Sequence, residues 1–539
     1  TTEIPESIQI PDVVETRFGT LRFEDGFPTE ETAQKVYDQL DFQRAVESVI
    51  LTTPAASLTG FRNGIREYGP DNETAIIWEE RMDSKVQLLT PNTTVIYVFL
   101  WLNLKDGPMV VEAPPKVLGL IDDFWFRYVA DFGMAGPDRG KGGKYLILPP
   151  GYEGAVPEGY HVAQSATYGN WLLIRGFLED GDPQPGLNNI KENFKLYPLG
   201  KTASASKVTY HDISMKYLNT IHASDETYFE EINKVVQEEP SESQSPEILG
   251  LLASIGIEKG KPFNPDARMQ KILKEAADVG SAASRVVLYR NRDAEAKVYP
   301  NSGWEHPWIG GSHTFTRNGA RLIDARTRFH MYATGITPAM VTPKVGSGTQ
   351  YIAGMRDSEG HPLDGAKTYK VHLPPNVPAK DFWSFVNYDP QTRSLLQTDQ
   401  QYPSVVSQRG VQANSDGSCD IYFGPEAPEG KESNWIQTVP GKGWNMLFRL
   451  YGPLEPWFNQ SWQPGDLELL GCGIPHSWSS PSAIMLFLSS RFSSRTSASA
   501  SLRALISRRS SLTSLDVAWR SVSPDRRFLP ASRNSFDQR

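Results

Sequence analysis

The chain has 539 residues and a formal net charge of −9, and 39% of its residues are hydrophobic. This length allows two or three domains with complete cores, and the composition is that of a globular protein. Nucleic acids and anionic membranes attract basic surfaces, so we expect neither as a partner of this acidic chain. The two cysteines, Cys419 and Cys472, are too few for a disulfide framework or a thiolate zinc site.

The first predicted elements are a hairpin and a helix. Residues 1–29 form an N-terminal extension in which Gly19 and Gly26 mark turns. Thr29 is a suitable N-cap for a helix over 30–51, because its side-chain oxygen can accept a hydrogen bond from the first turn. No apolar run approaches the roughly 20 residues that a membrane-spanning helix needs, so we expect no membrane span.

Two later stretches carry the same signals in the same order, VVEAPPKVLGLIDDFWFRYVAD (110–131) and KVHLPPNVPAKDFWSFVNYD (370–389). Each has a strand-like run, a Pro pair and Asp-Phe-Trp before another apolar run. The match continues from NWLLIRGF to NMLFRLYG, which aligns Arg175 with Arg449. Short apolar segments divided by Gly and Pro turns favour a sandwich or barrel, so we interpret the repeat as two copies of one β-unit.

Helical signals fill the stretch between the two copies. Ser224 can cap a helix over 225–237. The next residues, 238–247, are rich in Ser, Glu and Pro and resemble a polar linker. Pro265 suits the first position of a further helix, where its missing N–H is not needed.

A last helix is predicted over 319–334, with Gly335 as its C-cap. The same stretch also alternates like a strand, but good helix formers fill much of it and Gly335 supplies a stop signal. The predicted buried stripe of this helix is Leu322, Ala325, Phe329 and Ala333.

These signals predict a mainly β protein of the α+β class, with two related antiparallel β-sandwiches. The first sandwich domain, with its N-terminal helix, covers 30–222, a helical connector covers 223–344, and the second sandwich domain covers 345–470. Residues 471–539 hold ten Arg and no Lys, a composition typical of GC-rich DNA translated out of frame. We expect this tail to be out of frame or disordered, rather than an Arg-rich arm for RNA.

The same segments resemble a known pair of bacterial families. TPNTTVIYVFLWLNLKDGPMVVEAPP resembles the DUF1254 domain, and TYKVHLPPNVPAKDFWSFVNYD with DLEL resembles the DUF1214 domain that usually follows it. The resemblance covers about 25–470 and implies an exported protein, periplasmic or secreted, with a jelly-roll-like β-sandwich in each domain. Both families are of unknown function, so the resemblance implies no catalytic residue and no cofactor.

Motifs for common catalytic and binding sites are mostly missing. The Gly/Lys run at 140–144 lacks the P-loop pattern and precedes a strand, so we interpret it as a turn. There is no GxSxG elbow and no HExxH helix. His306 and His313 could bind a metal together with Glu305, but a loop histidine pair is the preferred interpretation, and the metal requirement stays open.

The 319–334 helix carries the most reactive side chains. Asp324 and Arg328 are four residues apart, which places them on one helix face. The same spacing separates Arg326 from His330. In the catalytic interpretation His330 is a general base oriented by Asp324 or another carboxylate, and Arg326 holds an anionic group of the substrate. The alternative is a salt-bridged face without catalytic function.

A second group of polar residues brackets the first β-unit: Asn92, Tyr97, Asp122, Asp123 and Arg127. The Asp-Phe-Trp motif occurs in both copies, and a feature present twice serves the fold more often than one active site. We therefore expect Trp125 and Trp383 to anchor the cores.

Two classes of function remain open at this point. The slightly preferred one is an exported hydrolase that acts on a small ester, phosphoester or glycan-like substrate at a site between the domains. The other is a non-catalytic protein that binds a small molecule or glycan, or that assembles into a homo-oligomer.

Overall fold

The computed structural model of the chain describes residues 2–470. The predicted Ser/Arg-rich tail therefore lies outside the described residues, as does Thr1. The described part contains 26 strands and seven helices, which agrees with a mainly β chain of the α+β class.

The first β-unit consists of two sheets that pack face to face. The larger sheet has the order β14 (Thr209–Asp212), β4 (Thr74–Ile77), β6 (Val95–Asn103), β12 (Gly169–Phe177), β8 (Leu118–Asp123) and β9 (Tyr128–Gly133). The smaller sheet has the order β11 (His161–Gln164), β10 (Gly143–Leu148), β7 (Met109–Ala113) and β13 (Lys195–Pro198). Buried apolar residues from both sheets, such as Val98 and Val111, form one core between them.

The second β-unit repeats this arrangement. Its larger sheet has the order β16 (Trp304–Glu305), β19 (Thr349–Gly354), β25 (Asn445–Pro453), β21 (Ala379–Tyr388) and β22 (Ser404–Val406). Its smaller sheet has the order β24 (Trp435–Gln437), β23 (Cys419–Gly424), β20 (Tyr369–Leu373) and β26 (Glu468–Leu469). Strand β25 thus takes the place of β12, and the parallel pair β23–β24 takes the place of β10–β11. The repeat in the sequence corresponds to a repeated topology, in which the ladders are mostly but not wholly antiparallel.

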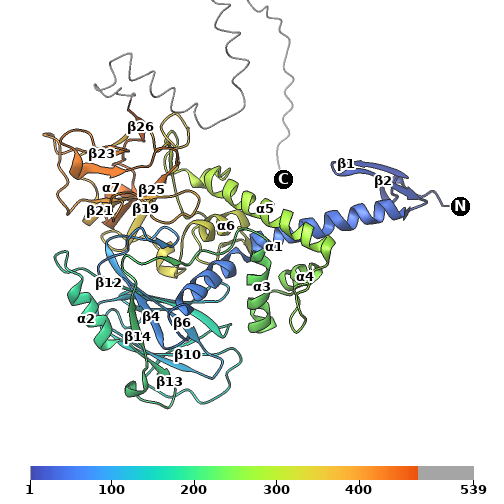
Figure 1. The fold of residues 1–539 in the computed structure, drawn as a ribbon, viewed down its shortest axis with the longest axis horizontal. Coiled ribbons are helices and arrows are strands. Elements are labelled where there is room, and N and C mark those ends of the chain that lie inside the picture. The colour runs from blue at the N-terminus through green and yellow to red at the C-terminus, as the bar shows by residue number, and fades with distance from the viewer. Residues whose placement is uncertain (1, 471–539) are drawn as a thin grey trace, which may run out of the picture. The chain divides into compact units, whose positions relative to one another are not determined.

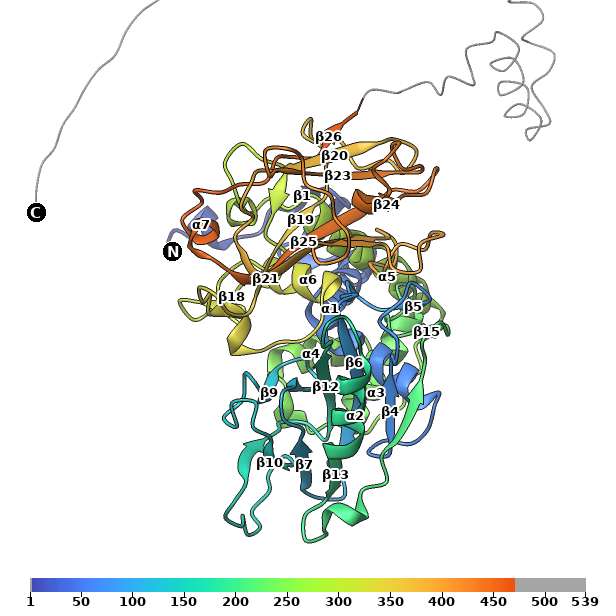
Figure 2. The same cartoon turned by 90° about the vertical axis from the view of Figure 1, so that its left-hand side faces the viewer.

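Helices cover the outer face of the larger sheets, some between the two sheets and others beside the first sheet (Figure 1 and Figure 2). The helices are α1 (Glu30–Arg66), α3 (Thr227–Glu238), α4 (Pro246–Ser254), α5 (Ala267–Tyr289) and α6 (Ile323–Tyr332). One apolar cluster joins them to both sheets, since it includes Trp171 of β12, Phe61 of α1 and Leu447 of β25. Each larger sheet therefore has one face in its own sandwich and the other against helices.

The burial of both sheet faces explains why the sequence of strand β6 is apolar throughout. Its sequence VIYVFLWLN has no polar alternation, because residues of one parity, such as Val98, pack inside the sandwich. Residues of the other parity, such as Phe99, pack against the helices. A continuous apolar run is what a strand buried on both faces requires.

The remaining elements are short or peripheral. A three-stranded sheet lies at the free end of α1, apart from the sandwich sheets (Figure 1). The peripheral elements are β1 (Val13–Thr16), β2 (Gly19–Glu24), β3 (Phe27–Pro28), β5 (Val86–Gln87), β15 (Leu218–Asn219), β17 (Thr316–Arg317), β18 (Ala320–Arg321), α2 (Gln184–Asn193) and α7 (Glu455–Phe458).

The predicted helix starts were right only in part. Thr29 does cap α1 and accepts a hydrogen bond from the backbone N–H of Thr32 at 3.3 Å, but the helix continues far beyond residue 51, to Arg66. The prediction for Ser224 was wrong, because α3 begins at Thr227 and Asp225 accepts the N–H of that residue instead.

Two further predictions in the connector were also wrong. Helix α5 does not start at Pro265, since the Asp266 carboxylate is its cap and accepts a hydrogen bond from Met269 N at 2.7 Å. The expected polar linker over 238–247 contains the start of α4, which Ser245 caps.

The last predicted helix is shorter than expected. Helix α6 spans Ile323–Tyr332, and the residues before it pair as β17 and β18. Gly335 has a φ of +85°, but it lies beyond the C-cap residue Ala333. In that position Gly335 packs against Leu120 of the first β-unit.

Candidate functional site

Helix α6 carries the three residues predicted to be catalytic, and their side chains have separate partners. Asp324 lies at the exposed start of the helix and forms an ion pair with Arg292 at 3.0 Å. Arg326 donates a hydrogen bond to the backbone carbonyl of Leu51 at 3.1 Å. His330 is 1% exposed, and its Nδ1 has no hydrogen-bond partner. The structure therefore forms neither predicted i,i+4 pair, and the catalytic assignment stays a prediction.

The surroundings of His330 are aromatic. Its ring centroid lies 4.8 Å from that of Phe126, 5.7 Å from Phe315 and 5.2 Å from Phe329. Burial, with a smaller effect of the Arg326 charge, holds the pKa of His330 well below its usual range. The imidazole is therefore neutral at physiological pH and packs as an aromatic side chain.

A different residue of α6 forms the buried ion pair of this region. The Arg328 side chain is 0% exposed and contacts Glu305 at 2.7 Å. His306 is half-buried, and burial followed by the charge of Arg328 lowers its pKa. His313 packs against Tyr128 instead. Within residues 2–470, no group of three or more His, Cys, Asp or Glu side chains could hold a metal ion, so the metal interpretation of this loop has no support.

Two of the polar residues that bracket the first β-unit, Asp122 and Asp123, have different partners. Asp123 pairs with Arg127 at 2.6 Å. Asp122 is fully buried and accepts a hydrogen bond from Ile336 N at 2.9 Å, while its other carboxyl oxygen has no partner. Burial raises the pKa of Asp122 well above its usual range, and the nearby charges of Asp123 and Asp131 add to this effect. Burial therefore disfavours the charged form of Asp122.

The two tryptophans of the repeated motif are buried, as expected of core anchors. Trp125 is 6% exposed and donates its indole N–H to the hydroxyl of Ser243 at 2.9 Å. Trp383 is 8% exposed and packs against Phe385 and Phe448.

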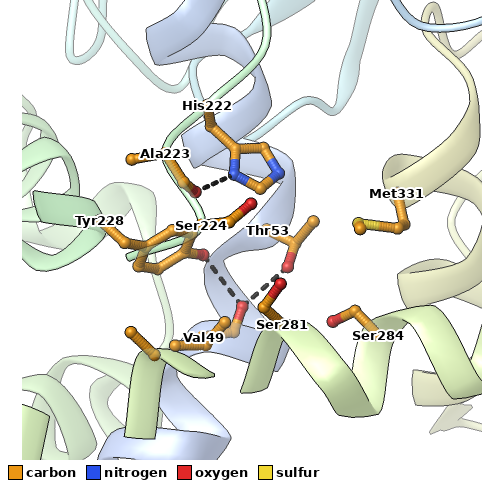
Figure 3. Close-up of a pocket in the computed structure, with 10 residues that line it drawn as sticks. Val49, Thr53, His222, Ala223, Ser224, Tyr228, Ser281, Ser284 and Met331 are labelled. Carbon is orange, nitrogen blue, oxygen red and sulfur yellow. Dashed lines mark hydrogen bonds between the residues drawn. The ribbon is translucent and has the colours of Figure 1, made fainter. Parts of the chain in front are cut away.

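A pocket opens among the helices at a place that no sequence motif marked (Figure 3). The space that it encloses is small, with room for about one water molecule. Thr53 of α1, Tyr228 of α3, Ser281 of α5 and Met331 of α6 line it together with His222. Helix α6 therefore reaches the pocket through Met331 and not through a predicted catalytic residue.

Two glycines of α1 position His222. A Cβ on Gly60 would lie 2.5 Å from the carbonyl oxygen of Thr220, and a Cβ on Gly64 would lie 2.7 Å from that of Asn219. The segment that follows β15 can therefore lie directly on the helix only because both residues lack a side chain. This contact places His222 at the wall of the pocket.

His222 is 8% exposed and held by a backbone contact. Its Nδ1 lies 2.6 Å from the carbonyl oxygen of Ala223, and the N–H of Ala223 in turn donates to the Glu231 carboxylate. Burial, followed by the nearby charges of Arg393 and Arg285, lowers the pKa of His222 to about 4, although the Ala223 contact acts in the opposite direction. Because a carbonyl oxygen can only accept, Nδ1 carries the ring hydrogen and Nε2 carries a lone pair.

Nε2 of His222 has no hydrogen-bond partner among the described residues. Figure 3 shows this nitrogen turned away from Ala223, and the Ser281 side chain of α5 lies in the wall of the same pocket. The Ser284 hydroxyl, by contrast, donates to the carbonyl oxygen of Gly280 at 2.9 Å. A buried acceptor without a donor is uncommon in folded proteins, because it loses its hydrogen bond to water without replacement. The arrangement can accept one hydrogen bond from a small bound molecule.

Comparison with protein families accounts for the repeated part of the chain. Residues 73–198 match the DUF1254 model and residues 348–455 match the DUF1214 model, both described as proteins of unknown function. The chain carries these two domains in tandem. The DUF1254 match runs from β4 to β13, and the DUF1214 match runs from β19 to α7.

One solved structure shows a similar fold. The VPA0106 protein from Vibrio parahaemolyticus is 19% identical, with a TM-score of 0.50 over 80% of this chain and 100% of its own. An uncharacterized protein from Burkholderia cenocepacia is 11% identical, with a TM-score of 0.35 over 81% of this chain and 96% of its own. The similarity to the Vibrio parahaemolyticus protein concerns the fold and carries no information about function. Comparison with curated proteins finds no match.

The pocket lies outside both family domains. All the residues that line it belong to α1, to the segment from His222 to α3, and to α5 and α6, none of which the DUF1254 or DUF1214 match includes. The two domains act here as supports for a site that the helices build. No helix between residues 2 and 470 has the length and hydrophobicity that crossing a bilayer requires.

Proposed function

We propose that this DUF1254–DUF1214 chain binds a small polar molecule in the helical pocket, through a hydrogen bond from the ligand to Nε2 of His222. The observation that carries the proposal is that this buried acceptor has no partner and borders a pocket. Of the nine other lining residues, five carry hydroxyl groups and four are apolar, so the pocket offers a ligand both polar and apolar contacts.

The low pKa of His222 favours binding over catalysis. A general base works best when its pKa lies near the operating pH, whereas burial has lowered that of His222 to about 4. Such a ring stays neutral throughout the physiological range and accepts a proton poorly. It is a constant hydrogen-bond acceptor, suited to a ligand with a hydroxyl or amide N–H group.

The hydrolase alternative keeps one supporting observation. The neutral imidazole of His222 shares its pocket with the hydroxyl groups of Ser281 and Ser284, and nucleophilic catalysis uses these residue types. A small ester, phosphoester or glycan-like substrate would fit this chemistry. The earlier assignment to His330, Asp324 and Arg326 belongs to the same alternative.

Three finer predictions belong with the proposal. They are jelly-roll-like connectivity of the sandwiches, a periplasmic or secreted location, and assembly into a homo-oligomer. The family resemblance supports the first two, and the tandem sandwiches support the third by general analogy.

The test compares His222→Phe with the wild-type chain. Phenylalanine keeps the ring but removes the acceptor, so molecules small enough for this space, such as methanol and formamide, should bind the wild type and not the variant. The control is His361→Gln, because His361 is 66% exposed and does not line the pocket. Binding would be followed by ligand-observed NMR.

Equal binding to the wild type and to His222→Phe would contradict the proposal. Turnover of p-nitrophenyl acetate by the wild type, lost in His222→Phe and kept in His361→Gln, would favour the hydrolase alternative instead.

A further inference from the structure

The N-terminal arm of the chain exposes an unusual share of apolar surface. We define the arm as residues 2–37, which comprise β1, β2, β3 and the first two turns of α1, at the end of that helix that lies apart from the sandwich sheets (Figure 1). Among residues 2–470, 19 large hydrophobic side chains are exposed, and seven of them belong to this short arm. The most exposed are Phe27, Ile8, Ile4 and Tyr37. Single exposed hydrophobic residues are normal, whereas a concentration of them indicates an interaction surface.

The arm is attached to α1 but covers little of its own apolar surface. The Arg22 N–H donates to the Thr32 hydroxyl at 2.8 Å, and Lys35 Nζ donates to the carbonyl oxygen of Thr20 at 3.4 Å. Within residues 2–37, Leu21 is the only buried hydrophobic side chain. Small sheets gain stability by burying a hydrophobic face, so the arm has apolar area left for a partner to cover.

The strand register places two of the exposed residues on one face of the arm. Leu21 of β2 is buried, so the alternation of side chains along a strand turns Arg22 and Glu24 to the outer face. Val13 of β1 lies opposite Arg22, and Phe27 of β3 lies opposite Glu24. Residues directly opposite each other in an antiparallel pair share a face. The outer face therefore has an apolar side chain on each edge strand and two opposite charges between them.

This face matches a second copy of itself. A twofold axis can bring Arg22 of one copy to Glu24 of the other, and the reverse, while the apolar side chains meet. The seven exposed side chains present roughly 800 Å² per arm, which is the share that one partner contributes to a standard interface. Between residues 38 and 470 the other twelve are spread along the chain, so no other part of comparable length exposes as many.

We propose that the arm is a dimerisation surface, packed with its outer face against the outer face of the same arm in a second copy of the chain. This inference rests on the homo-oligomer predicted above and assigns the surface that forms it. The arm shares no residue with the His222 pocket, so ligand binding at His222 and dimerisation are separate measurements.

The experiment is sedimentation equilibrium of the full chain at micromolar concentrations, which yields the dissociation constant of the dimer. Val13→Ser with Phe27→Ser removes the two apolar side chains of the outer face, and both are already exposed, so circular dichroism should show an intact fold. Tyr217→Ser is the control, because Tyr217 is a 68% exposed aromatic residue outside the arm. Arg22→Glu creates like charges across the contact, and adding Glu24→Arg restores opposite ones.

We expect a dimeric wild type, a dissociation constant at least tenfold higher for Val13→Ser with Phe27→Ser, and no change for Tyr217→Ser. Arg22→Glu should also weaken the dimer, and the exchange of both charges should restore it. A wild type that is monomeric at every concentration would overturn both this proposal and the homo-oligomer prediction. A dimer that Val13→Ser with Phe27→Ser leaves unchanged would overturn the arm as its surface and leave the oligomer itself standing.

Discussion

Gly60 of α1 contacts the backbone of Thr220 so closely that a Cβ at this position would lie 2.5 Å from the carbonyl oxygen of that residue. The obstacle is backbone, which cannot rotate out of the way as a side chain can. We expect Gly60→Ala to lower the free energy of unfolding by about 1–3 kcal/mol, as overpacking does. It should also displace His222 and weaken ligand binding in the pocket.

Gly250 of α4 provides the matched control for this substitution, since a Cβ there would meet nothing within 4 Å. Gly250→Ala should raise stability by about 0.5–1 kcal/mol through helix propensity. Urea denaturation of both variants measures the two effects. A Gly60→Ala chain as stable as the wild type would show that the contact with Thr220 can relax.

Asp131 makes stability depend on pH. It is 7% exposed, its carboxylate accepts a hydrogen bond from the Thr337 hydroxyl, and burial raises its pKa to about 6. Because the pKa is higher in the folded state than the usual 3.8, the folded chain binds more protons, and stability falls as the pH rises from about 4 through 6. The loss is at most about 3 kcal/mol.

Asp131→Asn keeps the shape and an acceptor for Thr337 but cannot ionise. The wild type should lose more stability than Asp131→Asn between pH 4.5 and 7.5, measured by urea denaturation. His222, whose depressed pKa acts in the opposite direction, is present in both chains and cancels in the comparison. Parallel pH profiles for the two chains would contradict this prediction.

Removing the carboxylate of the Arg328–Glu305 ion pair should lower the free energy of unfolding much more than removing one from an ion pair on the surface. Glu305→Gln leaves the fully buried guanidinium without its anion, and we expect a loss of about 3–5 kcal/mol in unfolding free energy. Glu258→Gln, in the exposed pair with Lys261, is the control and should cost at most about 1 kcal/mol. Similar losses in both variants would mean that Arg328 finds another partner or water.

His330→Phe tests the role first suggested for α6. His330 packs among phenylalanine rings and its Nδ1 has no partner, so replacement by Phe removes an unsatisfied polar atom. Stability should stay equal or rise by about 1 kcal/mol in thermal unfolding. Loss of esterase turnover in a stably folded His330→Phe chain would instead support a catalytic histidine.

The sequence predicted the β-units well because their signals are local and repeated. Pro pairs, Gly turns and short apolar runs mark strand ends directly, and the motif around Trp125 recurs around Trp383. The helix ends were harder to predict, since Ser224 is a good cap by its side chain, yet α3 begins after Glu226, which makes no side-chain capping hydrogen bond. Helix α4 was not predicted either, because it has only nine residues and follows a stretch rich in turn-forming residues.

The pocket could not be predicted because no short motif contains it. His222 and Ser281 lie far apart in sequence, and the close approach of the chain to Gly60 that positions His222 is visible only in three dimensions. The alignment of Arg175 with Arg449 was visible in the sequence. The burial of Arg449 was not, since burial is a property of the folded chain.

The apolar cluster shared by α1 and both larger sheets has a consequence for how the chain unfolds. Neither sandwich can separate from the helices without exposing one whole face of its larger sheet, including Trp171 on one side and Leu447 on the other. The sequence repeats therefore do not divide the molecule into independently melting parts. We expect a single cooperative calorimetric transition, and a fragment limited to 73–198 should aggregate through the apolar face that the helices normally cover.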